Sequence, residues 1–537
     1  MVYSTGYIVG SGGGYSAHEL IPDCSRVLPG TNCSTSIDMA RDSNPLLLQS
    51  KKVCVVGAGM AGLAAARELR REGHDVAVLE QSGGVGGQWL YDPRTDGVHS
   101  SSIYASLRLI SPRQTTGFTD FPFFPRDGRD NRRFPGHREV HRYLTDFCDA
   151  FGIMETVRLH TRVLRAAMTP TRQWEVRSVD LRECDTEEKM FRDEVFDAVV
   201  VASGHYSQPR LPSIKGMEAW RGRQMHSHSY RVPEPFRGEV VVVIGCGESG
   251  RDIAMEIRGV AKKVHLVANS MEEVTPGLSK VLAKHSANLH LQLGVERLCE
   301  DGVVVFGGGG GSGVVADTVV YCTGYNYSFP FLDTGGAVAV DDNRVGPLFE
   351  HVFPPSLAPS LSFVGIPKKV RKYQPPSYVR SQYSRPISPI LGRCIGLILQ
   401  VFAPRFFEAQ ARWVAQVLSG KRTLPSEEEM LRSVEEYYRA REIAGVPKKY
   451  THEIGKFDPP YMDEFGDKYC DFPRVERWKH EMLLSSVHSM RDNLETFRDD
   501  YQDSDSIKDG VKEWHLSAQH QDAAATETVA RLHEQKL

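Results

Sequence analysis

The chain has 537 residues, of which 41% are hydrophobic and 25% charged, and its formal net charge is −3. This is the composition of an ordinary globular protein with a large core, and so weak a charge gives no reason to expect nucleic acid as a partner. The ten cysteines include no CxxC pair. Their spacing argues against a zinc site and against a redox-active disulfide, so no metal is expected. Scattered thiols also fit a reducing compartment such as the cytoplasm.

The N-terminal segment, residues 1–50, is rich in Gly, Ser and Thr. It lacks the apolar core of a signal peptide and is predicted to be a disordered leader. No apolar run reaches the ~18 residues needed to span a bilayer, so no transmembrane segment is expected. The final residues, Gln535-Lys536-Leu537, only loosely resemble a peroxisomal signal. The expected location is therefore the cytoplasm, with the peroxisome and the endoplasmic reticulum surface as alternatives.

A glycine-rich loop follows the first predicted strand. The apolar run Val53–Val56 has the pattern of a buried parallel strand, and it leads into GxGxxG over 57–62. A helix pattern over 61–71 and a second strand over 76–79 come next, and this strand ends at Glu80. Because strand, loop, helix, strand and acid arrive in order, the pattern favours a dinucleotide site over an ordinary glycine-rich turn.

Each part of this unit suits a dinucleotide. Gly57 permits the tight turn, Gly59 lets the backbone approach the pyrophosphate, and Gly62 lets the helix pack close to the strand. The helix N-terminus offers unpaired N–H groups to the phosphates, and Glu80 can accept hydrogen bonds from ribose hydroxyls. The glycines within 83–87 either let backbone approach a second part of the cofactor or form a plain surface turn.

A second unit of the same kind begins at Val240. Its apolar strand runs into GxGxxG over 245–250, and the next strand, 264–268, is followed by Asn269 and Ser270 rather than by an acid. A carboxylate at this tip would repel a 2′-phosphate, so its absence favours NADP over NAD. Arg251 is the candidate to bind that phosphate, and a solvated helix arginine is the alternative.

Two further apolar strands, 196–202 and 317–325, end in small residues and bracket the second unit. The simplest arrangement inserts the second unit into the first. The predicted fold is therefore α/β, with two Rossmann-like dinucleotide-binding domains and a helical C-terminal part. The predicted boundaries are 51–208 and 318–500 for the first domain, 209–317 for the second, 405–419, 427–444 and 474–499 for the C-terminal helices, and 501–537 for a polar tail. The glycine-rich stretch 307–313 is interpreted as a hairpin or loop.

The most specific motif lies between Trp220 and Tyr230. It has the form FxGxxxHxxxY with Trp220 in place of Phe, and Gly222, His226 and Tyr230 match. Three further stretches, at 321–332, 351–361 and 493–498, are similar to characteristic segments of the family that has this signature. On these motifs the chain resembles the flavin-containing monooxygenases over about 51–500, most closely the plant S-oxygenating (glucosinolate S-oxygenase-like) branch. His226 is interpreted as a structural histidine in preference to a proton-transfer group.

The resemblance implies that the first domain binds FAD and the second binds NADPH. In the family, NADPH reduces the flavin, which adds O₂ to form a C4a-hydroperoxide and oxygenates a soft nucleophile such as a thioether sulfur or an amine nitrogen. Since the cofactor supplies this chemistry, no side chain is predicted to be catalytic. The predicted FAD contacts are Gly57, Ala58, Gly59, Met60, Ala61, Gly62, Glu80, Gly86, Gly87, Gln88, Trp89, Thr323 and Gly324. The predicted NADP contacts are Gly245, Cys246, Gly247, Glu248, Ser249 and Gly250.

One departure from the family lies at Ile110. The segment 104–113 is similar to a family segment that has Asn at this position, beside the flavin, where it hydrogen-bonds near the oxygen intermediate. Ile110 cannot donate a hydrogen bond, although a slip of one residue would place Ser111 there instead. Partial uncoupling is therefore a hypothesis. An NADPH oxidase that releases hydrogen peroxide and an inactive flavin-bound interaction protein stay open as alternatives, whereas the missing CxxC disfavours a thioredoxin-reductase-like enzyme.

The second departure is an apparent insertion at about 370–401. The stretch around it, 368–403, is basic and partly apolar and contains no Asp or Glu. Such a segment is either a solvated loop, which is the preferred interpretation, or a contact for an anionic membrane surface.

Overall fold

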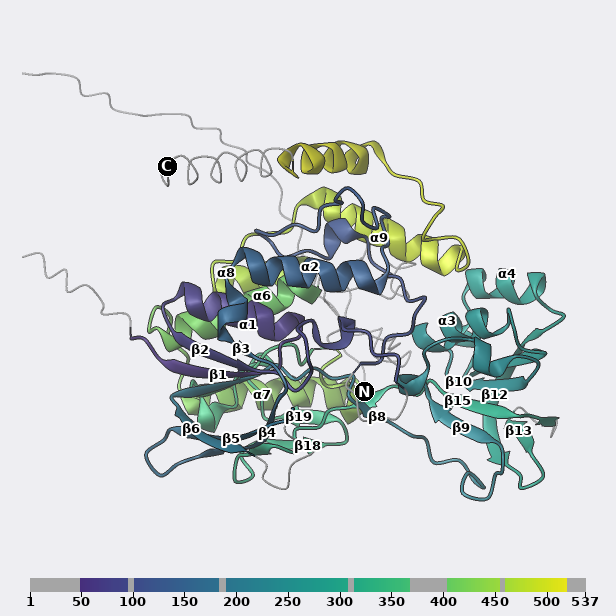
Figure 1. Ribbon diagram of the computed structural model, residues 1–537, viewed down its shortest axis with the longest axis horizontal. Coiled ribbons are helices and arrows are strands. Elements are labelled where there is room, and N and C mark those ends of the chain that lie inside the picture. The colour runs from purple at the N-terminus through teal and green to yellow at the C-terminus, as the bar shows by residue number, and fades with distance from the viewer. Residues whose placement is uncertain are drawn as a thin grey trace, which may run out of the picture. The chain divides into compact units, whose positions relative to one another are not determined.

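The computed structural model describes residues 49–94, 101–182, 190–307, 313–367, 403–453 and 459–518 (Figure 1). The predicted leader lies outside these ranges, apart from its last two residues, 49 and 50. The whole of the predicted insertion at 370–401 also lies outside them, as does the proposed membrane contact through 368–403 except for its final residue.

The first sheet has parallel strands in the order β20-β7-β1-β2-β3. Its strands are β1 (Lys52–Val56), β2 (Asp75–Leu79), β3 (Val157–Arg158), β7 (Ala198–Val201) and β20 (Leu361–Phe363). Val55 of β1 packs in a cluster with helices α1 (Met60–Arg71) and α6 (Ala403–Leu418), whereas Val56 packs in another cluster with Trp174. Both faces of the central strand are covered, which explains the unbroken apolar run in its sequence.

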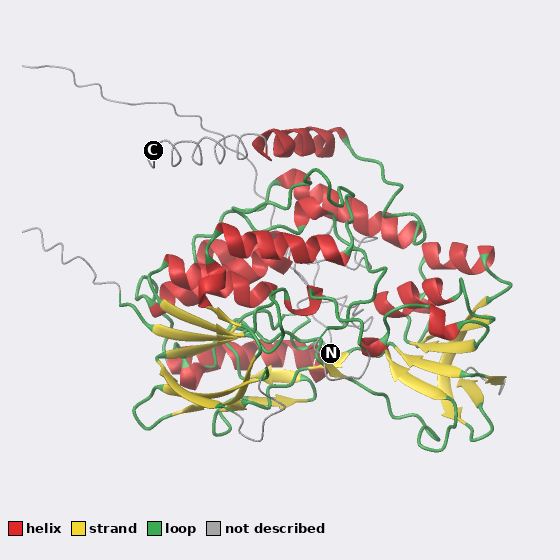
Figure 2. Cartoon of the chain, viewed as in Figure 1, coloured by secondary structure: helices red, strands yellow, loops and turns green. Residues whose placement is uncertain are grey.

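A smaller sheet covers the face of the first sheet opposite α1 and α6 (Figure 2). Its order is β17-β4-β5-β6, and its strands are β4 (Thr161–Met168), β5 (Trp174–Asp180), β6 (Phe191–Phe196) and β17 (Leu332–Asp333). Two short antiparallel pairs join β8 (Gln208–Pro209) to β16 (Tyr325–Asn326) and β18 (Ala339–Asp341) to β19 (Arg344–Gly346). None of these strands was expected from the sequence.

The second sheet has the order β14-β13-β12-β11-β10-β15-β9. Its strands are β9 (Arg223–His226), β10 (Val240–Ile244), β11 (Lys263–Ala268), β12 (Leu289–Leu298), β13 (Val303–Gly307), β14 (Gly313–Val315) and β15 (Thr318–Tyr321). Helices α3 (Glu248–Ile257) and α4 (Pro276–Lys284) pack on one face. Strands β13 and β14 pair antiparallel on either side of 308–312, which themselves lie outside the described residues. The expected α/β fold with two Rossmann-like units is therefore confirmed.

The structure corrects the position of one strand. Residues 318–325 were expected to return to the first domain, but β15 pairs in parallel with β10 and β9 of the second sheet. The strand that returns to the first sheet is β20, which pairs with β7. The boundary at 318 therefore comes too early. Both strands are buried and apolar, so their sequences cannot show which sheet each one joins.

Further helices among the described residues are α2 (His137–Ala150), α7 (Glu427–Ile443), α8 (Pro459–Tyr469) and α9 (Arg477–Asp492). The three predicted C-terminal helices correspond to α6, α7 and α9, whereas α2 and α8 were not predicted. A buried ion pair between Arg67 of α1 and Glu408 joins α6 to the first unit. Of the helices that the structure describes, none is both long enough and apolar enough to cross a membrane.

The expectation of a polar, frayed tail from residue 501 is wrong for its first part. Residues 505–518 are helical, and those after 518 lie outside the described residues. Ile507 and Trp514 are buried, and the Trp514 ring lies 4.5 Å from that of Phe124. Burial of these two large apolar side chains docks the helix on the rest of the protein.

Candidate functional site

The first glycine-rich loop is shaped by close backbone contacts. Gly57 has a φ of +102°, and a Cβ added there would come within 2.8 Å of the Ala202 carbonyl oxygen. A Cβ on Gly62 would lie only 1.9 Å from the carbonyl oxygen of Gly57. The N-cap residue of α1 is Gly59, which has no side chain to satisfy the first N–H groups of the helix. These groups are therefore suited to bind phosphate.

Glu80 lies directly against this loop. One carboxylate oxygen accepts the Ala58 N–H at 2.7 Å, and the other accepts the Ser82 N–H at 2.8 Å. The side chain is 5% exposed. The structure thus brings the predicted acid to the loop and fixes both of its oxygens.

The predicted segment 86–89 also lies against the loop. The Gly86 N–H donates to the Ala58 carbonyl oxygen at 2.9 Å. A Cβ on Gly87 would lie 2.8 Å from the Cα of Gly59, so the two backbones touch. Gln88 and Trp89 follow in the 3₁₀ helix η1 (Gly87–Trp89). Only glycines permit so close a contact between the two backbones. The loop at 57–62 and the segment at 86–89, which are separate in the sequence, therefore form one continuous surface for a ligand.

The second loop repeats the geometry of the first. Gly245 has a φ of +114°, and a Cβ there would lie 2.4 Å from the Cys322 carbonyl oxygen. A Cβ on Gly250 would lie 1.7 Å from the carbonyl oxygen of Gly245. The N-cap of α3 is Gly247, so this helix also presents its first N–H groups, next to the predicted contacts Glu248 and Ser249. Both loops therefore fit a dinucleotide.

The tip of β11 differs from the sequence-based expectation. It was expected to lack a carboxylate, but Glu273 of the next turn accepts hydrogen bonds from Asn269, through the backbone N–H at 3.2 Å and Nδ2 at 3.1 Å. Arg251 is not solvated either. It is buried, and its Nε donates to the Cys246 carbonyl oxygen at 2.9 Å. The GxGxxG spacing rule did not find Glu273 because the acid lies beyond the strand end rather than on it.

Thr323 and Gly324 lie beside the second loop, although they were predicted as FAD contacts. They follow β15, and the preceding residue, Cys322, touches Gly245. Arg210 fixes the Thr323 carbonyl oxygen with two donors, at 2.7 and 3.0 Å. Because β15 belongs to the second sheet, this position favours a role of both residues at the nicotinamide-nucleotide site.

The signature motif connects elements around the second unit. A Cβ on Gly222 would lie 2.3 Å from the Trp220 ring, so only glycine fits there. His226 donates through Nε2 to the Gly324 carbonyl oxygen at 3.0 Å and accepts the His228 N–H on Nδ1 at 3.0 Å. Burial lowers the pKa of His226 to about 4. A neutral ring with both nitrogens bonded supports the structural interpretation of His226.

Ile110 is partly buried and packs against the apolar cluster of the second unit. The Thr116 hydroxyl donates to the Pro112 carbonyl oxygen at 2.8 Å, so in the 3.1 Å contact between Ser111 and Thr116 the donor is Ser111. The Ser111 hydroxyl therefore donates its proton to Thr116 and has no second proton to donate to a bound group. Arg498 donates to the Leu109 carbonyl oxygen at 3.1 Å and holds this segment from the C-terminal region.

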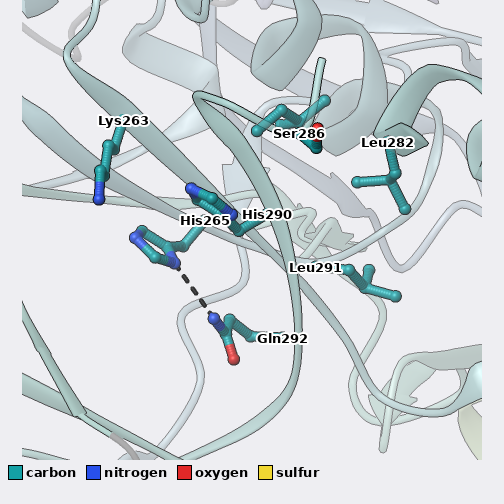
Figure 3. A pocket seen from close by; sticks show the side chains of 8 residues that line it. Lys263, His265, Leu282, Ser286, His290, Leu291 and Gln292 are labelled. Carbon is teal, nitrogen blue, oxygen red and sulfur yellow. Dashed lines mark hydrogen bonds between the residues drawn. The ribbon is translucent and has the colours of Figure 1, made fainter. Parts of the chain in front are cut away.

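A pocket of about 420 Å³ lies elsewhere on the second unit (Figure 3). It includes Lys263 and Leu289, the first residues of β11 and β12, and a hydrogen bond of 3.2 Å between His265 and Gln292. Ligands of parallel sheets bind outside the carboxyl ends of the strands. This pocket lies at their amino ends and is therefore separate from both loops.

Comparisons with known proteins agree with the geometry. The flavin-binding monooxygenase-like family model matches residues 50–284 and 285–387. The chain is 48% identical over 490 residues to flavin-containing monooxygenase FMO GS-OX-like 8 of Arabidopsis thaliana, which covers 88% of this chain and 96% of that protein. It is 50% identical over 489 residues to FMO GS-OX-like 9 of the same plant, with 87% and 97% covered.

Among solved structures, the fold is similar to that of an S-allyl-L-cysteine S-oxygenase from Allium sativum. The identity is 37%, the TM-score is 0.72, and the match covers 89% of this chain and 100% of that chain. The resemblance to the plant S-oxygenating branch is thereby confirmed. With two loops that fit dinucleotides, these matches show that the chain belongs to the flavin-binding monooxygenase-like family and is a flavin-dependent oxidoreductase.

Proposed function

We propose that the chain is an NADPH-dependent FAD monooxygenase that acts through a flavin C4a-hydroperoxide on a small soft nucleophile, a thioether sulfur in preference to an amine nitrogen. The observation that carries this proposal is the pair of glycine loops with matching steric requirements, at 57–62 and 245–250. The preference for sulfur is supported by the similar Allium sativum enzyme, whose substrate, S-allyl-L-cysteine, is a thioether.

The residues of the chain bind and orient the cofactors and are not assigned to the reaction itself. FAD supplies the redox and oxygen chemistry when it is bound. The first loop and the segment 86–89 offer backbone to its diphosphate, and Glu80 is placed for its ribose. His226 is neutral with both ring nitrogens bonded, so no proton transfer is assigned to it.

Ile110 supports a second candidate function, an NADPH oxidase that releases hydrogen peroxide. An isoleucine offers no hydrogen bond to an oxygen intermediate, and the neighbouring Ser111 hydroxyl donates to Thr116. If this segment lies at the flavin as in the family, part of the NADPH consumed is expected to yield hydrogen peroxide instead of product.

The test is a balance of NADPH consumed, sulfoxide formed and hydrogen peroxide released by the FAD-loaded protein, with S-allyl-L-cysteine as the substrate and a tertiary amine as the alternative. Equal amounts of NADPH and sulfoxide would support a coupled monooxygenase. Hydrogen peroxide as the sole product with every thioether and amine would identify an oxidase. A flavin that NADPH does not bleach under anaerobic conditions would identify an inactive flavin-bound protein.

Replacing Ile110 tests whether this residue causes the loss of NADPH to hydrogen peroxide. Ile110→Asn restores a donor and is expected to lower the share of NADPH lost to hydrogen peroxide about fivefold, the factor that a hydrogen bond worth about 1 kcal/mol provides. Ile110→Leu, which keeps the side chain apolar, is the matched control and is expected to leave the share unchanged. An Asn variant that leaks as much as the wild type would contradict a place for Ile110 beside the oxygen intermediate.

A further inference from the structure

The end of β11 carries a carboxylate that its own sequence does not contain. The 3₁₀ helix η6 (Met271–Glu273) turns the chain back, so that the Glu273 carboxylate reaches Asn269, the first residue after the strand. One of its oxygens accepts the Asn269 backbone N–H, and the other accepts the Nδ2–H of the same residue. Two donor atoms of Asn269 thus hold a negative charge at the strand tip.

This tip is where the coenzyme's adenosine ribose is expected. In a dinucleotide-binding unit, the residue that ends the second strand contacts the ribose 2′ position. Glu80 occupies the same place in the first unit. Burial raises the pKa of the Cys246 thiol to about 11, Arg251 opposes this rise, and the Glu273 carboxylate adds to it. Glu273 therefore lies within electrostatic reach of the second glycine loop.

The arrangement disfavours a 2′-phosphate in two ways. The phosphate would face the negative charge of Glu273. It would also find two of the three Asn269 donors, the backbone N–H and one Nδ2–H, already bonded to that carboxylate, although such N–H groups are the natural partners of a phosphate. The basic residue expected to compensate, Arg251, is buried and donates through Nε to the loop carbonyl of Cys246.

We propose that Glu273 determines coenzyme selectivity by weakening the binding of the 2′-phosphate, so that the second site accepts NADH as well as NADPH. The inference rests on the proposed function only in placing a nicotinamide coenzyme at the second loop. Glu273 is a specificity residue and takes no part in oxygen transfer.

The test measures the binding of 2′,5′-ADP and 5′-ADP to the FAD-loaded protein by calorimetry, since these probes differ in the 2′-phosphate and require no turnover. In the wild type the two dissociation constants are expected within about tenfold of each other, because a single charge-assisted hydrogen bond would already separate them by more. Glu273→Gln removes the charge and keeps one acceptor oxygen. It is expected to tighten 2′,5′-ADP about fivefold and to leave 5′-ADP unchanged.

Glu272→Gln is the matched control. Glu272 is an exposed neighbour on the same turn, and its replacement makes the same change in net charge. It is expected to alter neither constant by more than about twofold. The effect of Glu273→Gln should shrink in high salt, since the side chain is only partly buried. Equal shifts for both probes, an unchanged ratio, or no binding of either probe would overturn the inference.

A kinetic measurement separates this inference from the proposed function. Anaerobic reduction of the flavin by NADH is expected in the wild type, and Glu273→Gln should raise the preference for NADPH over NADH about fivefold. If the protein oxygenates no substrate but the preference still shifts, the monooxygenase proposal fails and the selectivity inference stands. If NADPH alone reduces the wild-type flavin, the selectivity inference fails whatever the products are.

Discussion

The two glycine-rich loops have the same backbone requirement but obtain their carboxylates differently. A Cβ on the third glycine would lie 1.9 Å from the first glycine's carbonyl oxygen in one loop and 1.7 Å in the other. Glu80 follows its strand directly and is 5% exposed, whereas Glu273 comes from a later turn and is partly exposed. Close packing of the helix on the strand requires glycine at the same position of both loops. The carboxylate near the ribose, in contrast, can come from different places in the chain.

The largest effect is expected from the two equivalent glycines. Gly62→Ala forces a Cβ into the Gly57 carbonyl oxygen, which should cost about 3 kcal/mol of stability and abolish FAD retention on gel filtration. Gly250→Ala makes the same clash in the second loop. It should leave the flavin-to-protein absorbance ratio intact and abolish flavin reduction by NADPH.

Gly73→Ala is the control for the first unit. Gly73 also has a positive φ, +85°, but its Cβ would meet nothing within 4 Å. It should cost about 1 kcal/mol and retain FAD. Loss of FAD from the Gly250 variant to the same extent as from the Gly62 variant would show that the two loops do not act as separate sites.

The second largest effect tests the difference between the acids. In Glu80→Gln, an amide nitrogen must face either the Ala58 or the Ser82 N–H, because both carboxylate oxygens now accept backbone donors. One of these two N–H groups, at least partly buried, loses its partner, which should cost about 2 kcal/mol and weaken FAD binding. The partly exposed Glu273→Gln should change the denaturant midpoint much less. Equal losses of stability in the two variants would contradict a structural role for Glu80 and a role in coenzyme selectivity for Glu273.

The sequence was sufficient where one local steric rule decides the structure. GxGxxG after an apolar run located both loops, and Glu80 followed from its distance along the chain. It failed where partners are set by tertiary packing. The pattern could not assign β15 to the second sheet, because β15 and β20 are both short, buried and apolar. Glu273 was missed because the spacing rule looks for an acid at the end of the strand. This acid lies four residues beyond Asn269, and the turn η6 returns its carboxylate to the strand end.

A smaller effect is expected at Gly324, which decides to which site the end of β15 belongs. Its φ is +83°, so Gly324→Ala strains the backbone by about 1 kcal/mol and should shift the neighbouring Thr323. If the segment serves the second loop, the NADP⁺ dissociation constant should rise about fivefold while the FAD content stays constant. Loss of FAD with unchanged NADP⁺ affinity would instead support the sequence-based assignment of Thr323 and Gly324 to FAD.

The last effect appears only below neutral pH and concerns the pH dependence of the His226 contact with Gly324. Burial lowers the pKa of this histidine from about 6.5 in the unfolded chain to about 4. Between these values the unfolded chain binds more protons than the folded protein, so the contribution of His226 is complete above pH 6.5 and is lost as the pH falls toward 4. In the wild type about 2 kcal/mol should be lost at this position between pH 7 and pH 5.

His226→Gln isolates this contribution, because its amide can donate to the Gly324 carbonyl oxygen and accept the His228 N–H without titrating. The variant should be less stable than the wild type at pH 7, and the gap between their urea midpoints should narrow at pH 5. His488→Gln, at a partly buried position of α9, is the control for replacing a histidine outside the signature motif. A constant gap between pH 7 and pH 5 would mean that His226 is not held neutral, and the structural role of the signature histidine would then need another basis.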